Sequence, residues 1–233
     1  MEIALVVALA SYNNIANLIP AFNGRLYVPL NCLAAGAVVG VGIGALGLTR
    51  QELGLDEPQG ADLLTGLAIG LALTAPLYAA LSWRRTTALL ADKRVAGLSG
   101  GELAYQTLIR IPVGTALLEE IAFRGVLFGA LSSRGNFYAG AISSIVFGLW
   151  HISPTLNLVR ANRPDATAAD GARTIAGAVV LTALAGGALV WLRIYSGGLL
   201  APWALHAALN SSATLAAVLA HRRLSRHRDP ANA

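Results

Sequence analysis

The stretch Ile111-Pro-Val-Gly-Thr-Ala-Leu-Leu-Glu119-Glu120-Ile-Ala-Phe-Arg124-Gly-Val-Leu-Phe-Gly129 places two adjacent glutamates and one arginine in an otherwise membrane-like run. Burying one acid at the bilayer centre costs about 2.5–3.5 kcal/mol even on lenient insertion scales. Arg124 follows Glu120 by four residues, so one helical turn brings these two side chains together. Glu119 points about 100° away from Glu120 on a helix and lacks such a partner. We therefore expect Glu119 to have a functional role.

The composition predicts an all-α, polytopic integral membrane bundle that forms a single domain over residues 1–233. Of the 233 residues, 55% are hydrophobic and 12% are charged, whereas a soluble domain has about 25% charged residues. Several apolar runs approach the roughly 20 residues that a membrane-spanning helix needs. Cys32 is the single cysteine, which excludes an intrachain disulfide and a multi-cysteine metal site.

We expect about seven transmembrane helices, within a range of six to eight. The predicted segments are Met1–Pro20, Leu26–Leu48, Ala61–Trp83, Glu102–Ser132, Phe137–Ile152, Thr174–Tyr195 and Gly198–His221. The first is the weakest, because polar residues crowd its second half, and a short or interfacial helix is an alternative. The fourth is too long for one straight span. Pro112 favours a helix start or a kink there, with Glu102–Ile111 along the membrane interface.

The distribution of basic residues predicts the orientation. With the loop between the third and fourth segments in the cytoplasm, twelve of the 17 Lys and Arg residues lie inside. Only Arg50, Arg134 and Arg193 fall outside, and Arg110 and Arg124 lie at or within a span. This bias predicts an external N-terminus and a cytoplasmic C-terminus in a multi-pass protein of the cell membrane. Residues 222–233 are predicted to be a basic cytoplasmic tail near anionic headgroups.

Four smaller features carry expectations of their own. The region Ser153–Arg173 reads as a mobile linker. Gly36, Gly40 and Gly44 recur every four residues, which favours close helix packing over the nucleotide-binding pattern Gly-x-Gly-x-x-Gly that Gly42–Gly47 also fits. The sequence Tyr195–Gly198 reads as a tight turn between the last two helices. The four tryptophans lie mostly near segment ends, as interface anchors do.

Two further apolar segments carry polar residues at helical spacing. Phe147 and His151 are four residues apart, as are His206 and Asn210, so each pair shares a helix face. Together with the glutamates, these residues supply the groups needed to activate water and stabilise an oxyanion. The simpler interpretation is that each polar side chain makes a packing hydrogen bond between helices. That structural interpretation is favoured for Glu120 and Arg124.

Three motifs in order resemble a known family. Glu119-Glu120-x-x-x-Arg124, Phe147-x-x-x-His151 and His206-x-x-x-Asn210 are similar to the signature of the CAAX protease and bacteriocin-processing family. These are intramembrane proteases, also called Abi proteins in bacteria, related to the type II CAAX prenyl endopeptidase. The Leu53-Gly54-Leu55 sequence also resembles a common family feature.

The resemblance implies catalytic roles. Glu119 would be the catalytic glutamate, and His151 would help it hold the attacking water. His206 and Asn210 would bind the developing oxyanion, while Glu120, Arg124 and Phe147 would support the site. The requirement for a cofactor is left open. A glutamate-activated water without metal is slightly favoured, and zinc or another divalent metal held by Glu119, His151 and His206 is the alternative. His-Glu-x-x-His, the zincin signature, is absent from the sequence.

The function expected on this basis is cleavage of a peptide bond in a membrane-tethered or membrane-inserted protein or peptide. The partners are therefore this substrate and the lipid bilayer, without nucleic acid, and the oligomeric state is left open. One alternative is a non-enzymatic membrane protein, such as an immunity or scaffold protein. A proton-coupled transporter is less favoured, because the segments show no paired inverted halves.

Overall fold

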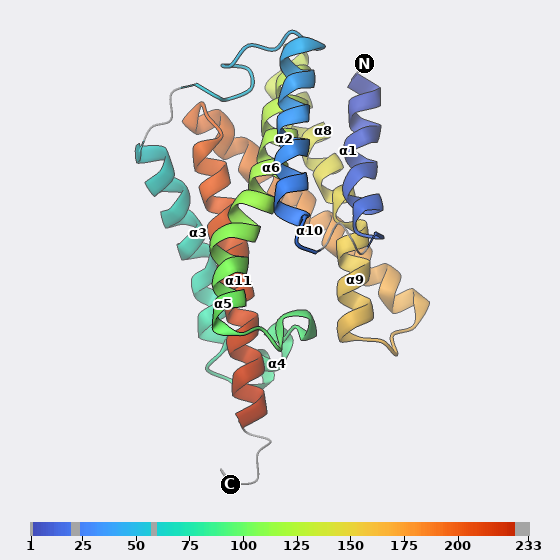
Figure 1. Cartoon of the computed structure of the whole chain (residues 1–233), viewed down its shortest axis with the longest axis vertical. Helices are drawn as coiled ribbons and strands as arrows, with labels where there is room; N and C mark the ends of the chain where they lie inside the picture. The colour runs from blue at the N-terminus through green and yellow to red at the C-terminus, as the bar shows by residue number, and fades with distance from the viewer. Residues whose placement is uncertain (1, 20–23, 57–59, 227–233) are drawn as a thin grey trace.

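The computed structural model describes residues 2–19, 24–56 and 60–226, and these residues form helices joined by loops, without a strand. The helices are α1 (Glu2–Ala16), α2 (Tyr27–Gly44), α3 (Gly60–Ala80), α4 (Arg84–Leu90), η2 (Lys93–Val95), α5 (Gly100–Tyr105), η3 (Gln106–Ala116), α6 (Leu117–Glu120), η4 (Ile121–Leu127), α7 (Phe128–Leu131), η5 (Ser132–Arg134), α8 (Asn136–Trp150), α9 (Ile152–Asn162), α10 (Ala168–Ser196) and α11 (Leu200–Arg226). The start of α1 and the end of α11 lie at opposite ends of the molecule (Figure 1).

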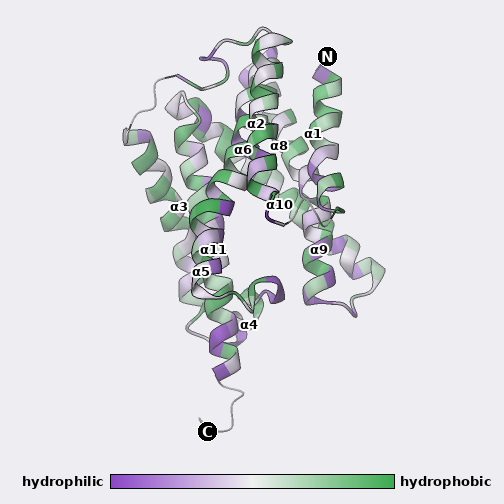
Figure 2. Ribbon diagram, viewed as in Figure 1, coloured by the Kyte–Doolittle hydropathy of each residue, from purple (hydrophilic) through white to green (hydrophobic). Residues whose placement is uncertain are grey.

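The predicted all-α membrane bundle is confirmed. Five helical stretches are long and apolar enough to cross a membrane: 27–44, 60–80, 136–162, 168–196 and 200–226. In α2 and α3, only 11% and 17% of the apolar window is buried within the protein. Figure 2 shows hydrophobic residues along the sides of α3 and α10, and hydrophilic residues at α4 and the end of α11. Apolar outer faces of this kind suit contact with lipid.

Two of the seven predicted segments are not among these five. The first is a 15-residue helix, α1, which agrees with the short-helix alternative. The fourth is a helical run from Gly100 to Leu131, formed by α5, η3, α6, η4 and α7 in succession. Ser99 begins this run with a capping box, in which its side chain and that of Glu102 bind each other's backbone N–H groups. This run is called the central helix below.

Of the two alternatives predicted at Pro112, a helix start is wrong, because the central helix continues through this residue, while a kink stays a prediction. Pro112 lies in η3, a π-helical stretch in which the Leu117 N–H donates to the Pro112 carbonyl five residues earlier. The same carbonyl accepts a 2.9 Å hydrogen bond from Nε1 of Trp203 on α11. In a regular α-helix, the proline ring would clash with the preceding turn. The wider hydrogen-bonding pattern of a π-helix accommodates it.

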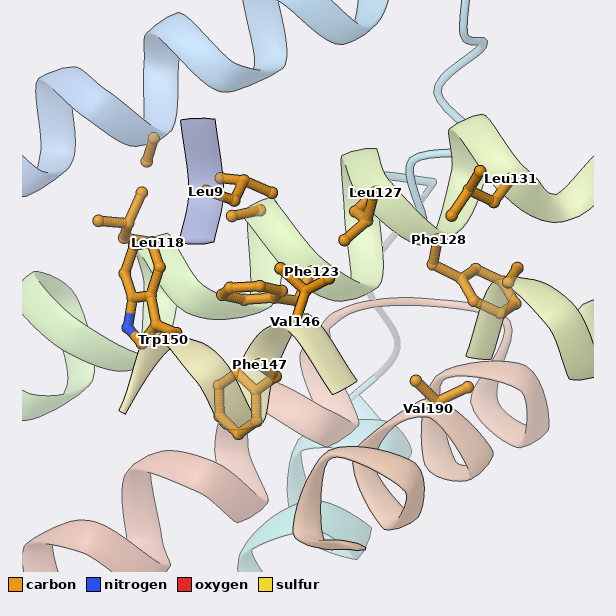
Figure 3. Packing of buried hydrophobic residues seen from close by; sticks show 13 residues of the cluster. Leu9, Leu118, Phe123, Leu127, Phe128, Leu131, Val146, Phe147, Trp150 and Val190 are labelled. Carbon is orange, nitrogen blue, oxygen red and sulfur yellow. The ribbon is translucent and has the colours of Figure 1, made fainter. Parts of the chain in front are cut away.

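Apolar packing against the central helix forms the main core. Phe123 of η4 meets Phe147 and Trp150 of α8 edge-on, with ring centroids 5.1 and 5.2 Å apart. Figure 3 shows these rings beside Leu118 and Leu127. Small residues let the outer helices approach closely: a Cβ at Gly70 of α3 would lie 2.8 Å from the Cβ of Ala208 on α11. The catalytic candidates on the central helix are therefore enclosed by α8, α10 and α11.

The predicted linker Ser153–Arg173 is wrong for most of its length, because α9 and the start of α10 occupy it. The first turn of α9 is held by α1, since the Ser153 N–H donates to Oδ1 of Asn14 at 2.8 Å. Asn14 is one of the polar residues that made the first segment the weakest predicted membrane span. It thus serves as a partner for another helix. The predicted turn is confirmed: α10 ends at Ser196, and Gly197 follows with a φ of 72°.

Two other expectations need correction. Gly36, Gly40 and Gly44 face open space rather than a packed helix, and Gly42 is the glycine of α2 in contact, with Val126 and Leu53. Trp150 is not an interface anchor, because it is only 1% exposed. Residues 227–233 of the predicted tail lie outside the described residues, and the orientation of the termini remains a prediction.

Candidate functional site

Glu119 and Glu120 lie on α6, a single α-helical turn between the π-helical stretches η3 and η4. Both side chains are buried, with Glu119 5% and Glu120 1% exposed. The helical geometry separates them, so that Glu120 faces Arg124 and Glu119 faces a different part of the protein. π-Helical insertions often occur at functional sites, because they reposition side chains without ending the helix.

The predicted pairing of Glu120 with Arg124 is present. Nη1 of Arg124 donates to Oε1 of Glu120 at 3.1 Å, and both side chains are almost fully buried. Nη2 of Arg124 also donates to the Gly186 carbonyl on α10 at 3.3 Å. The guanidinium carbon lies 4.1 Å from the ring centroid of Phe147, a cation–π contact. Arg124 therefore links the central helix to α8 and α10.

His206 of α11 lies between the two glutamates. Its Nδ1 is 2.7 Å from Oε1 of Glu120, and its Nε2 is 3.6 Å from Oε2 of Glu119. The first distance is that of a strong hydrogen bond, whereas the second leaves a gap. A carboxylate accepts only, so Nδ1 donates to Glu120. Glu120 thus fixes the orientation of the imidazole, and Nε2 is directed towards Glu119.

Glu119 has a partner that the sequence did not reveal. Nε1 of Trp150, at the end of α8, donates to Oε1 of Glu119 at 2.9 Å. The other carboxylate oxygen, Oε2, is buried and accepts no hydrogen bond from the part of the chain that the structure describes. Glu119 is thus anchored through one oxygen, while the other faces His206. An aromatic residue next to His151 on an apolar segment was the available signal for Trp150.

His151 directly follows Trp150, the last residue of α8. Its Nδ1 lies 2.7 Å from the Phe147 carbonyl, which can only accept, so Nδ1 carries a proton and Nε2 is the nitrogen that has a lone pair in the neutral ring. The Phe147 ring packs edge-on against His151, with centroids 4.7 Å apart, and against His206 at 5.9 Å. Phe147 therefore contacts both histidines.

The structure thus brings some candidates together and leaves others apart. Glu119, Glu120 and His206 form one contacting group, with Arg124 and Trp150 attached to it. His151 contacts this group through Phe147. Asn210 lies one turn beyond His206 on α11, is half-buried, and makes no side-chain hydrogen bond with the described residues. Direct contacts of His151 and Asn210 with Glu119 remain predictions.

A cavity of about 920 Å³ reaches the site from one end of the bundle, and Glu120 is among its lining residues. Leu117 and Ile121 of the central helix and Trp203 of α11 line it as well. Arg50, Asp56 and Asp62 also line the cavity. Apolar and charged side chains thus line the same cavity.

The Leu53-Gly54-Leu55 sequence forms part of the cavity wall and is held by a buried arginine. Nη2 of Arg193, on α10, donates to the carbonyls of Gln51 and Glu52 at 3.0 and 3.2 Å. Arg193 is 6% exposed, so this predicted external arginine is buried within the protein. Gly54 has a φ of 67°, and a Cβ there would collide with the Arg193 guanidinium. The segment 51–55 is called the clamped loop below.

The side chains do not form a ready metal site. No group of three or more His, Cys, Asp or Glu residues is arranged to hold a metal ion within residues 2–19, 24–56 and 60–226. Nδ1 of His206 is engaged by Glu120, and the Phe147 ring packs edge-on against both His206 and His151. The predicted alternative ligand set of Glu119, His151 and His206 is therefore not assembled.

Comparisons with known proteins agree with the motifs. Residues 102–212 match the family described as Type II CAAX prenyl endopeptidase Rce1-like. A stretch of 36 residues is 56% identical to "Putative membrane peptidase YdiL" of Bacillus subtilis (strain 168), and this stretch covers 15% of the chain and 15% of that protein. No solved structure matches the chain significantly. The family match includes all three motifs, so the resemblance to this family of membrane proteases is confirmed over residues 102–212.

Proposed function

We propose that this chain, whose residues 102–212 match the Rce1-like endopeptidases, is an intramembrane endopeptidase that cleaves a membrane-tethered or membrane-inserted protein or peptide. The observation that carries the proposal is the position of His206 between Glu119 and Glu120. One carboxylate orients the imidazole, and the second keeps an oxygen available for proton transfer. The two carboxylates thus take different roles, because their surroundings differ, as is common in acid–base catalysis.

In the proposed mechanism, Glu119 takes a proton from a water molecule through Oε2. The water oxygen attacks the carbonyl carbon of the substrate, and the carbonyl oxygen becomes an oxyanion. In its imidazolium form, His206 donates from Nδ1 to Glu120 and from Nε2 to this oxyanion, with the Asn210 amide as a second donor. Glu119 then returns its proton to the amide nitrogen, so that the C–N bond breaks and yields a carboxylic acid and an amine; the acid then passes its remaining proton to the amine, which gives a carboxylate and an ammonium group.

Trp150 and His151 take supporting roles. The indole of Trp150 holds Oε1 of Glu119, which leaves Oε2 as the basic oxygen. Nε2 of His151 carries a lone pair in the neutral ring, because Nδ1 is committed to the Phe147 carbonyl. This nitrogen would accept a hydrogen bond from the attacking water and orient it. The buried pair of Glu120 and Arg124 keeps the site assembled.

The experiment compares membrane proteins from cells that express the wild type or Glu119→Gln. Quantitative proteomics of peptide termini should detect cleavage products with the wild type that are missing with Glu119→Gln. Glu102→Gln is the control, since Glu102 lies on the same helical run but caps its exposed start. Termini that persist with a folded, membrane-inserted Glu119→Gln protein would contradict the proposal.

A second arm addresses the metal. The purified protein, stripped of metal by a chelator, should keep its Glu119-dependent activity. Loss of activity that is restored by zinc alone would overturn the glutamate mechanism and favour a metal-dependent one.

A further inference from the structure

A second cavity lies at the end of the molecule where α11 ends, and it shares no residue with the cavity at Glu120. Its volume is about 680 Å³. It lies between α4, η2, α9 and α11 and is lined by Ala88, Leu89, Ala91, Lys93, Asn162, Arg163, His221, Leu224 and Ser225. These lining residues include two cations and an imidazole but no acid. Figure 2 shows the hydrophilic character of this end. The charge favours an anionic ligand.

Hydrogen bonds hold the walls of this cavity in place. Oδ1 of Asn162 accepts from the Lys93 backbone N–H at 2.8 Å, which ties α9 to η2. Nη2 of Arg163 donates to Oγ1 of Thr174 at 2.8 Å, which ties the end of α9 to α10. The Lys93 ammonium group has no ion-pair partner in the described ranges. The backbone of Lys93 and the side chain of Arg163 are therefore held at the cavity, and both residues are exposed to a ligand.

Asp92, between the lining residues Ala91 and Lys93, is already paired with a cation. Asp92 lies 2.7 Å from Nη2 of Arg94 and also accepts a 3.0 Å hydrogen bond from Nδ2 of Asn162. Burial raises the pKa of Asp92, but the hydrogen bonds from Arg94 and Asn162 more than offset it, so the net shift is downward. Asp92 thus stays an anion that is committed to Arg94, and the charges of Lys93 and Arg163 are not offset by it.

Apolar residues at the cavity indicate which kind of anion would bind there. Leu89 lines the cavity and is 84% exposed, and Leu224 of α11 also lines it. Trp83, just before α4, is 74% exposed, as an anchor at the membrane interface would be. A free phosphate would use the cations but not Leu89. An anion that carries an acyl chain would use both.

We propose that this cavity binds the phosphate headgroup of an anionic phospholipid, with Lys93, Arg163 and His221 as its ligands and Leu89 against an acyl chain. Basic cavities between helices at the end of a membrane bundle are suited to such headgroups. The inference does not depend on the endopeptidase activity, because no lining residue belongs to the site at Glu119.

The test titrates the full chain, in a neutral detergent, with phosphatidylglycerol or phosphatidylcholine and counts bound lipids by native mass spectrometry. The wild type should bind phosphatidylglycerol at least about tenfold more tightly than phosphatidylcholine, the effect of one or two charge-assisted hydrogen bonds. Lys93→Gln combined with Arg163→Gln should abolish that preference. The same change at Arg84 and Arg85 removes equal charge from exposed residues outside the cavity and should leave the preference intact.

Three results would overturn the proposal. In the first, the Lys93 and Arg163 double variant keeps the preference. In the second, the Arg84 and Arg85 variant loses it equally, which indicates general surface charge. In the third, millimolar inorganic phosphate displaces phosphatidylglycerol completely, which identifies the ligand as a soluble anion rather than a lipid. Circular dichroism of each variant establishes that the fold is intact.

Discussion

Nδ1 of His206 lies 2.7 Å from Oε1 of Glu120, the same oxygen that accepts a hydrogen bond from Arg124. One carboxylate oxygen is thus shared by an imidazole on α11 and a guanidinium on the central helix. The sequence motif suggested that Glu120 only supports the helix through Arg124. The geometry adds a second connection, because any change at Glu120 alters the orientation of His206. The predictions below separate these contributions.

The first prediction concerns the two glutamates. Glu119→Gln should reduce kcat by about 10²–10⁴, the usual contribution of a general base, while the amide oxygen can still accept from Trp150. Glu120→Gln should reduce kcat less, because it disturbs the orientation of His206 but leaves the base. Initial rates on a cleaved substrate, compared at equal amounts of folded protein, measure both. A larger loss with Glu120→Gln would exchange the assigned roles.

The second prediction concerns the stability contributed by Arg124. Arg124→Ala leaves Glu120 as a buried anion without its cation and should lower the free energy of unfolding by about 3–5 kcal/mol. Arg94→Ala removes an ion pair whose arginine is 45% exposed, and such pairs contribute about 1 kcal/mol or less. Denaturation in mixed micelles measures both variants. Equal effects would show that the buried pair has no special importance.

The third prediction concerns Trp150 as a positioning residue. Trp150→Phe keeps an aromatic ring in the core but removes the N–H that donates to Glu119. We expect kcat to fall about tenfold with KM unchanged, since a hydrogen bond to a charged group contributes about 1.5–3 kcal/mol. Trp191→Phe is the control, because Trp191 is 61% exposed. A change in KM alone would argue for substrate binding by Trp150 instead.

The fourth prediction concerns Asn210. Its side chain makes no hydrogen bond with the described residues, so Asn210→Ala should leave the unfolding temperature unchanged. Removing one oxyanion donor should nevertheless reduce kcat by about 10²–10³. Ser212→Ala on the same helix should affect neither quantity. If Asn210→Ala is fully active, the oxyanion role falls to His206 alone.

The fifth prediction isolates the contact between Gly54 and Arg193. Gly54 and Gly47 have nearly equal φ angles of 67° and 69°, but only a Cβ at Gly54 meets another group. Gly47→Ala should cost about 1–2 kcal/mol of stability from the left-handed backbone alone. Gly54→Ala should cost more and also reduce activity, because it displaces the clamped loop from the cavity wall. Equal losses in both variants would exclude a role for the Arg193 contact.

Hydropathy was sufficient to predict the class of fold, because apolar runs of membrane length indicate helices that cross a membrane; five of the seven predicted segments are such helices. It failed at α9, whose polar residues read as a linker when taken alone. This helix is fixed by Asn14 of α1, 139 residues away in sequence. It failed again at Gly36, Gly40 and Gly44, since the spacing of small residues does not tell which face of α2 has a partner.

Some contacts of the site could be predicted from the sequence, and others could not. The four-residue spacing of Glu120 and Arg124 predicted a contact that helix geometry alone produces. No spacing along the chain could predict which nitrogen of His206 meets which glutamate, because that depends on how α11 packs against the central helix. Trp150 was overlooked for a related reason: its indole N–H becomes a partner of Glu119 only when α8 lies beside α6.

The hydrogen bonds that hold the clamped loop have a consequence for how this sequence can vary. Arg193 donates to the carbonyls of Gln51 and Glu52, which every amino acid provides. The attachment therefore does not depend on the side chains at these two positions. In a saturation library, most replacements there should be tolerated. Gly54 and Arg193, in contrast, should accept almost none. The side chains in this wall of the proposed substrate cavity can thus change as the sequence diverges, while the hydrogen bonds from Arg193 are kept.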